Sequence, residues 1–263
     1  MPGNLQTFIP DKKDVLVSSI APRNDLLREL LSAPGIANYL LPELRAVTFN
    51  VNHVVYEQGD TIEVVYFPVD CVVSGLAIME DGTTLETSMV GREGLFGVSA
   101  ILGSGLARQW MWVTAGGSAI QLEARLLDKV FVENEATLKI LLRAYRSIVT
   151  QVSQRCVCNT RHTIVERLCC WLLMIHDRVG GTNLRLTQET IASRVGARRA
   201  GITVAAGMLQ EMEAIEYRRG QLHIRNRERL EAAVCECYAI LGADFHRPRR
   251  TSSTLSLKQT IDR

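Results

Sequence analysis

The chain has 263 residues, of which 47% are hydrophobic and 22% charged, and its formal net charge at pH 7 is +2. This composition is typical of an ordinary globular protein with one or two domains. The N-terminal sequence MPGNLQTFIPDKKDV has no apolar leader core, and charge or glycine interrupts every apolar run before it reaches membrane-spanning length. We therefore expect a cytoplasmic protein that has no membrane partner.

The small net charge hides an asymmetry along the chain. Residues 1–158 carry 13 basic and 17 acidic side chains, a net charge of −4, whereas residues 159–263 carry 17 basic and 11 acidic ones, a net charge of +6. A basic C-terminal part suggests a polyanionic partner such as nucleic acid, although a basic surface can also be merely solvated.

The cysteines do not predict a disulfide framework or a metal site. There are seven, an odd number, and six of them form the close pairs Cys156/Cys158, Cys169/Cys170 and Cys235/Cys237. A zinc or iron-sulfur site favours C-x2-C pairs, and a C-x-C pair on a helix would point its thiols to different faces. The five histidines are scattered singly. The sequence therefore predicts no metal and no cofactor.

Two segments with different periodicity open the chain. Residues 1–44 form an N-terminal helical segment, because apolar residues in 24–44 recur at helical spacing and are interrupted at Pro34-Gly35. Residues 45–122 contain short β-rich runs separated by Gly-Asp and Asp-Gly turns, and Asp81-Gly82 gives the clearest hairpin signal. Strands at this spacing predict an antiparallel β-barrel or jelly roll.

Residues 123–158 are predicted to hold connecting and dimerisation helices. Apolar side chains recur there with the 3-4-3-4 spacing of a heptad seam, at Leu138, Leu141, Tyr145, Ile148 and Val152. We expect this seam to join two copies of the chain over residues 136–156. The alternative is a helix that packs on its own barrel.

Residues 159–242 combine a helix-turn-helix pattern with a basic hairpin. A buried helix over about 160–179 ends at Gly180-Gly181; Thr187 can cap a next helix that Gly196 ends, and another helix starts near Arg198. The small residues Ala205, Ala206 and Gly207 are expected to let these helices approach closely. The runs IEYRR and QLHIR flank Gly220 and predict a wing that carries Arg218, Arg219 and Arg225. The polar residues 243–263 are expected to be a disordered tail.

The segment LTQETIASRVGARRAGITVAAGMLQ resembles the DNA-binding signature of the Crp/Fnr superfamily, and the likeness extends more weakly over residues 45–240. The resemblance implies an α+β fold with a cyclic-nucleotide-type barrel, a long dimerisation helix and a C-terminal winged helix-turn-helix. It also implies a homodimeric transcriptional regulator that binds a palindromic site in double-stranded DNA and contacts RNA polymerase. The close of the domain, RNRERLEAAVCECY, resembles a subgroup with a degenerate cyclic-nucleotide pocket.

The resemblance also implies which residues contact DNA. Family members read bases at the positions held here by Arg199, Ala200, Thr203 and Val204, but Ala200 and Val204 replace a typical acid and arginine, so the operator should differ from the family consensus. Arg198 and Arg199 could contact guanine or phosphate. The remaining expected contacts are to the DNA backbone, from Thr187 and Gln188 in the first helix and from Arg218 and Arg219 on the wing.

The barrel lacks the residues with which family members hold a cyclic nucleotide. In GREGLFGVSAILGSGLARQWMWVTA, Gly97 is followed by Val98 where the family has an acid, and Arg108 is followed by Gln109 where it has a hydroxyl residue. The effector is therefore unknown, with Arg108 as one candidate contact, and a non-standard cyclic-nucleotide pocket remains the alternative. Residues 1–70 contain no cysteine for the iron-sulfur cluster of the oxygen-sensing branch.

Two other classes of protein compete with a DNA-binding regulator. A cupin-like enzyme would need several metal-binding histidines in the barrel, which has only His53, and no G-x-S-x-G nucleophile motif occurs. We therefore expect no enzymatic activity. A barrel scaffold that binds only proteins would require the basic helix and wing to be inert.

Overall fold

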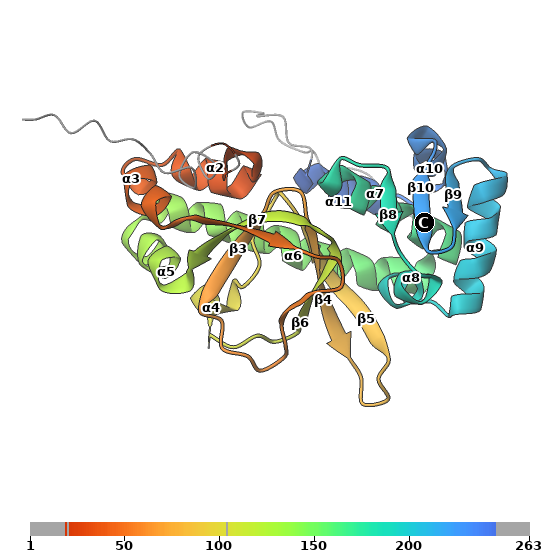
Figure 1. Ribbon diagram of the computed structural model, residues 1–263, viewed down its shortest axis with the longest axis horizontal. Helices are drawn as coiled ribbons and strands as arrows, with labels where there is room; N and C mark the ends of the chain where they lie inside the picture. Colours follow the sequence, from red (N-terminus) through yellow and green to blue (C-terminus); the bar gives the residue numbers. More distant parts are fainter. Residues whose placement is uncertain (1–18, 20, 104, 246–263) are drawn as a thin grey trace, which may run out of the picture.

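The computed structural model describes residue 19 and residues 21–103 and 105–245 (Figure 1). Short helices come first: η1 (Ala21–Arg23), α2 (Asp25–Leu31), α3 (Ile36–Leu40) and η2 (Leu41–Glu43). Asn24 caps α2 by accepting a hydrogen bond from the Leu27 amide, and its own side-chain amide donates to the carbonyls of Pro68 and Gly94. This buried residue thus fixes the helical segment, which the sequence predicted, to the barrel that follows.

The barrel consists of two antiparallel sheets. One has the order β1 (Arg45–Phe49), β7 (Gly117–Glu123), β3 (Val64–Pro68); the other has the order β2 (Val54–Tyr56), β6 (Trp110–Ala115), β4 (Val72–Ile78), β5 (Thr84–Val90). The short helix α4 (Ser99–Leu102) precedes β6. The predicted hairpin is present, because Gly82 takes the left-handed conformation (φ 80°) between β4 and β5. The structure confirms the antiparallel fold class of this part.

Two helices lead from the barrel to the C-terminal part. α5 (Ala124–Glu133) is followed by α6 (Glu135–Arg161), a 27-residue helix whose N-terminus is capped by the Asn134 side chain. In Figure 1, α6 runs along the long axis of the molecule behind the barrel. One face of α6 is buried within its own chain: Ile140 and Leu141 belong to the core that α2 and the barrel share, and Gln151 exchanges two hydrogen bonds with the backbone of Met89 on β5.

The C-terminal part is a winged helix-turn-helix. Its elements are α7 (Ile164–Val179), β8 (Asn183–Arg185), α8 (Gln188–Val195), α9 (Arg199–Glu211), β9 (Ile215–Arg218), β10 (Gln221–Ile224), α10 (Arg227–Ala233) and α11 (Cys237–Phe245). A capping box between Thr163 and Glu166 starts α7 four residues later than the periodicity indicated, and Gly180 ends it as predicted. α11 extends three residues into the predicted tail, and residues 246–263 lie outside the described residues.

The barrel and the C-terminal part meet around one buried carboxylate. Glu86, on β5, is 1% exposed. Its Oε1 accepts a hydrogen bond from Trp171 Nε1 on α7 (3.0 Å) and lies 3.1 Å from Arg155 on α6, while Oε2 lies 3.7 Å from Arg194 on α8. One acidic side chain therefore joins three helices to the barrel.

None of the helices in the described part of the chain is long and apolar enough to cross a membrane.

Candidate nucleic-acid interface

The turn between α8 and α9 is built as the sequence predicted. Thr187 caps α8, since its hydroxyl accepts a hydrogen bond from the Thr190 amide (3.0 Å). Gly196 ends α8 in the left-handed conformation (φ 68°), which a glycine adopts without steric cost. Arg198, two residues after Gly196, is the N-cap of α9, which begins at Arg199.

The inner face of α9 packs against α7 and α8. Ile202, Ala205, Ala206 and Leu209 are each at most 2% exposed. The close approach occurs at Gly201, where an added Cβ would lie 2.6 Å from Ile164 Cδ1. Our expectation for Gly207 was wrong, because a Cβ there would meet nothing within 4 Å. Gly207 therefore does not mediate helix packing, whereas Ala205 and Ala206 do.

The outer face of α9 is exposed and largely uncharged. Ala200, Thr203, Val204 and Met208 all lie on it, with Val204 60% and Met208 48% exposed. The Thr203 hydroxyl donates to Gln188 Oε1 (3.0 Å), which orients the first turn of α8 against α9. Sequence reasoning missed Met208, although its place four residues after Val204 on the same face was a usable signal.

Arginines border this face at the start of α9. Arg198 and Arg199 are exposed, and neither forms an ion pair with an acidic side chain among the residues that the structure describes. Burial raises the pKa of Tyr217 on β9, and the charge of the nearby Arg199 opposes that shift. Arg199, at the start of α9, is therefore near enough to the wing for its charge to act on Tyr217.

The wing is a tight hairpin held firmly against the two helices. Arg219 (φ 51°) and Gly220 (φ 76°) form its two-residue turn, since both take left-handed conformations. The Tyr217 hydroxyl donates to the Leu186 carbonyl (2.8 Å), and the Tyr217 amide donates to Gln210 Oε1 of α9 (2.9 Å). The orientation of the wing relative to α9 is thus fixed by hydrogen bonds.

The basic side chains of the wing differ in their partners. Arg218 and Arg219 are exposed and have no acidic partner within the described ranges. Arg225, expected on the same basic surface, instead pairs with Glu216 (2.9 Å). Sequence reasoning also missed Arg185: β8 places it beside Gln221, which in turn pairs with Arg218 across the sheet. Three exposed arginines therefore line this sheet and its turn.

The five residues of the predicted seam on α6 differ in how exposed their side chains are. Leu138, Tyr145 and Val152 are exposed, Ile148 is half-buried, and Leu141 is 1% exposed because it packs in the core of its own chain. Two other apolar residues are exposed between them, Leu142 (49%) and Val149 (46%). The exposed set, which we call the α6 stripe, is Leu138, Leu142, Tyr145, Val149 and Val152, with a 4-3-4-3 spacing.

Aromatic rings fill part of the barrel interior. Phe49, Tyr56, Tyr66 and Phe96 contact one another with ring centroids 5.0 to 6.2 Å apart. Arg108 is exposed. The neighbouring Gln109 accepts a hydrogen bond from Thr87 (2.7 Å) and donates one to Ser88 (3.2 Å), so it crosslinks β5 to the segment before β6.

Comparison with known proteins agrees with this architecture. Residues 166–233 match the family of Crp-like helix-turn-helix domains. A global nitrogen regulator from Nostoc sp. is 22% identical over 186 residues, which cover 67% of this chain and 83% of that protein.

Solved structures with a similar fold include FixK2 from Bradyrhizobium japonicum, which has a TM-score of 0.62 and 18% identity over 73% of this chain and 98% of that one. A CRP-family transcriptional regulator from Thermus thermophilus has a TM-score of 0.60 and 16% identity over 71% of this chain and 95% of that one. Residues 166–233 are therefore a Crp-like helix-turn-helix domain, and the chain as a whole shares its fold with these solved structures.

Proposed function

We propose that this chain is a DNA-binding transcriptional regulator of the Crp/Fnr type. It binds a palindromic DNA site as a homodimer, with each α9 in a major groove and each wing on the sugar-phosphate backbone. The observation that carries the proposal is the outer face of α9, which is exposed, largely uncharged and bordered by arginines that form no ion pair with the acidic side chains that the structure describes. Figure 1 places α9 at the end of the molecule farthest from the N-terminal helices, where a duplex can reach it. A helix presented in this way fits the major groove.

Base contacts are assigned to the exposed side chains at the start and middle of α9. Val204 and the Thr203 methyl group suit contact with a thymine methyl, and Met208 extends the same apolar surface; Arg199 can reach guanine O6 and N7 or a phosphate. Ala200 leaves room for close approach of a base edge.

Phosphate contacts are assigned to the residues around this face. Within the described ranges, Arg198, Arg218 and Arg219 have no acidic partner, and Arg185 is a fourth such arginine. Thr187 and Gln188 begin α8, where the helix N-terminus favours an anion. A phosphate backbone that follows these groups would fix the register of α9 in the groove.

The α6 stripe is the proposed dimer contact. Its 4-3-4-3 spacing buries one apolar edge against a second copy in the manner of a coiled coil. The stripe shares Leu138, Tyr145 and Val152 with the seam that the sequence indicated, and it adds Leu142 and Val149. It does not include Leu141, because that side chain is buried in the core of its own chain. Two copies related by a twofold axis would present two α9 helices to half-sites about 10 bp apart.

The barrel is proposed to act without cyclic AMP or cyclic GMP. Val98 packs against the core of the helical segment, Gln109 is engaged with Thr87 and Ser88, and rings occupy part of the interior. Val98 and Gln109 thus occupy the positions at which family members have the acid for the ribose hydroxyls and the hydroxyl residue beside the phosphate-binding arginine. The effector stays unassigned, with Arg108 as a candidate contact and RNA polymerase as the expected protein partner.

Selection of bound duplexes from a random pool tests the proposal. We expect an enriched palindrome whose half-site centres lie about 10 bp apart. Recovery of an unpaired single motif would contradict the dimeric arrangement. Equal affinity for the enriched and a scrambled duplex would contradict base recognition by α9.

A further inference from the structure

Four potential metal ligands meet where α6 ends. They are the thiols of Cys158, Cys235 and Cys237 and the imidazole of His162, and their ligand atoms all lie within 4.8 Å of one another. Cys158 lies in the last turn of α6 and His162 is the C-cap of that helix, whereas Cys235 precedes α11 and Cys237 is its first residue. The three cysteines are buried and the His162 side chain is 12% exposed.

The chain path explains why the sequence pattern did not predict this cluster. A C-x-C pair inside a helix would separate its thiols, but α10 ends before Val234, so Cys235 lies in the connection and only Cys237 belongs to α11. The backbone at Val234 is extended, so the chain leaves the helical path of α10 before Cys235. Packing of α11 on α6 then brings both thiols to Cys158 and His162, which are more than 70 residues away.

The distances within the cluster fit a tetrahedral ion. Cys158 Sγ lies 3.7 Å from Cys235 Sγ, and Cys237 Sγ lies 3.4 Å from His162 Nδ1. With Zn–S bonds of about 2.3 Å and Zn–N bonds of about 2.0 Å, the edges of a zinc tetrahedron are about 3.8 Å between sulfurs and about 3.5 Å between sulfur and nitrogen.

Neighbouring groups orient these ligands as outer partners do in zinc sites. Glu236 Oε2 lies 3.3 Å from His162 Nε2, so this carboxylate holds the imidazole with Nδ1 turned to the thiols. Gln154 Nε2 donates to Cys237 Sγ (3.1 Å), and the Cys237 amide and the Cys170 thiol hydrogen-bond to Cys235. Donors directed at sulfur stabilise thiolates.

We propose that Cys158, His162, Cys235 and Cys237 bind one Zn²⁺ ion. Each thiol releases a proton as it binds, and neutral His162 supplies Nδ1. Along the chain, Cys158 and His162 come before α7, which follows the junction at His162-Thr163, and Cys235 and Cys237 come after it. The ion therefore ties the last helix of the DNA-binding domain to the end of α6.

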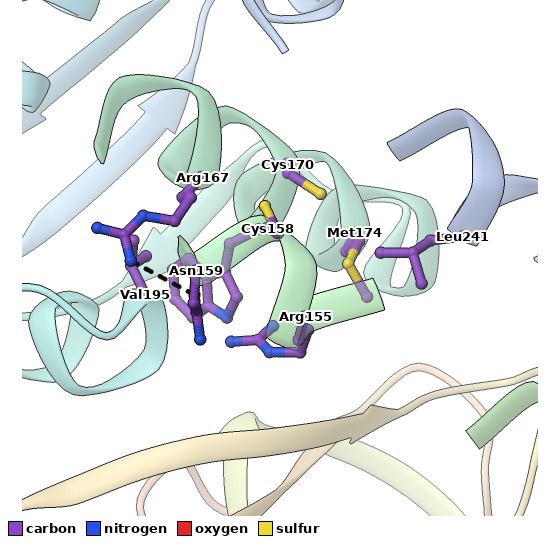
Figure 2. A pocket seen from close by; sticks show the side chains of 9 residues that line it. Arg155, Cys158, Asn159, Arg167, Cys170, Met174, Val195 and Leu241 are labelled. Atoms are coloured by element: carbon purple, nitrogen blue, oxygen red, sulfur yellow. Dashed lines mark hydrogen bonds between the residues drawn. The ribbon is translucent and has the colours of Figure 1, made fainter. Parts of the chain in front are cut away.

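The space beside the cluster does not suit a larger ligand. A cavity of about 20 Å³ lies between α6 and α7, lined by Cys158, Cys170 and Leu241 among others (Figure 2). This volume holds about one water molecule. A single ion bound by the side chains themselves is the occupant that the geometry favours.

Elemental analysis of the full-length protein, purified from cells grown with zinc, is the first test. We expect about one zinc per chain. After a chelator has removed the ion, added Co²⁺ should give the strong visible bands of tetrahedral thiolate coordination, and added Zn²⁺ should abolish them. Three thiols should become reactive toward an alkylating reagent only after chelation.

Variants assign the site to these residues. Cys235→Ser and Cys237→Ser should lose stoichiometric metal and the cobalt bands, whereas Cys156→Ser, an exposed cysteine on the same helix as Cys158, should keep both. Absence of zinc and of cobalt bands in folded wild-type protein would overturn the proposal without any variant. A disulfide between Cys158 and Cys235 in protein from reducing cells would overturn it as well.

Discussion

Individual arginines of the wing differ in whether the protein itself neutralises them. Arg218 is exposed without an acidic partner in the described part of the chain, whereas Arg225 on the neighbouring strand is paired with Glu216. Only an unpaired cation gains a new partner, and releases counterions, when a phosphate approaches. The two residues therefore form a matched pair for testing the role of the wing.

Arg218→Ala should weaken binding to specific and scrambled duplexes alike and make the slope of log K against log salt shallower by about one unit. Arg225→Ala should change the slope by less, since Glu216 already neutralises that charge. Fluorescence anisotropy titrations at several salt concentrations give both values. Equal slopes for the wild type and Arg218→Ala would mean that the wing does not contact phosphate.

Val204 is the residue at which base preference should be most sensitive. Its side chain is 60% exposed on the outer face of α9, where its apolar surface is proposed to meet a base. Val204→Ser should change the preferred base at one position by about 1–3 kcal/mol while nonspecific affinity stays nearly constant. Met212→Ser, at the end of the same helix, is the control. Competition between duplexes that differ at one base pair measures the effect.

At the scale of single elements, the sequence predicted those whose signal is local. The turn at Gly196, the cap at Thr187, the hairpin at Gly220 and the helical period of α6 follow from backbone preference or side-chain period, and the structure places each there. What the sequence left open depends on contacts between distant residues. The heptad pattern alone could not show that Leu141 faces its own barrel and Leu142 does not.

The same limit applies to the candidate sites. The residues proposed to contact DNA lie on consecutive local elements, so their grouping could be predicted. The cysteine-histidine cluster depends on α11 folding back against α6, and no period in the sequence records that contact. Glu86 was missed for the same reason, because its three helical partners lie 69 to 108 residues further along the chain.

Glu86 joins strand β5 to three helices through ion pairs and a hydrogen bond. Glu86→Gln would leave the buried Arg155 and Arg194 without their opposing charge, so the free energy of unfolding should fall by about 3–5 kcal/mol. Glu80→Gln, an exposed acid at the tip of the same hairpin, should change it by less than about 0.5 kcal/mol. Urea denaturation measures both. Equal stability of the two variants would show that the Glu86 contacts contribute little.

The barrel gives a further prediction at the scale of elements. Calorimetric titration with cyclic AMP or cyclic GMP should show no saturable binding at micromolar concentration, because Val98 and Gln109 are engaged within the protein. Arg108→Ala serves as the control. Binding that saturates in the wild type and weakens in this variant would restore a cyclic-nucleotide effector.

For the whole molecule, the α6 stripe predicts the state of assembly. Val149→Asp would place a charge in the centre of the proposed dimer contact, so the mass in solution should fall from that of two chains to that of one at micromolar concentration. Lys139→Asp, exposed outside the stripe on the same helix, should leave the mass unchanged. Light scattering decides between them. A dimeric Val149→Asp protein or a monomeric wild type would contradict the proposed contact.

The contact of one carboxylate with three helices has a consequence for communication through the molecule. A ligand that displaces Glu86 on β5 would disturb α6, α7 and α8 together, because Arg155, Trp171 and Arg194 all contact this one carboxylate. Suppose that only one orientation of α9 fits the groove and is adopted by a fraction of the molecules. The apparent dissociation constant for DNA is then the intrinsic constant divided by that fraction. A tenfold change in this fraction corresponds to about 1.4 kcal/mol. A change of that size in the contacts of Glu86 would alter the occupancy of the proposed operator without altering any residue that touches DNA.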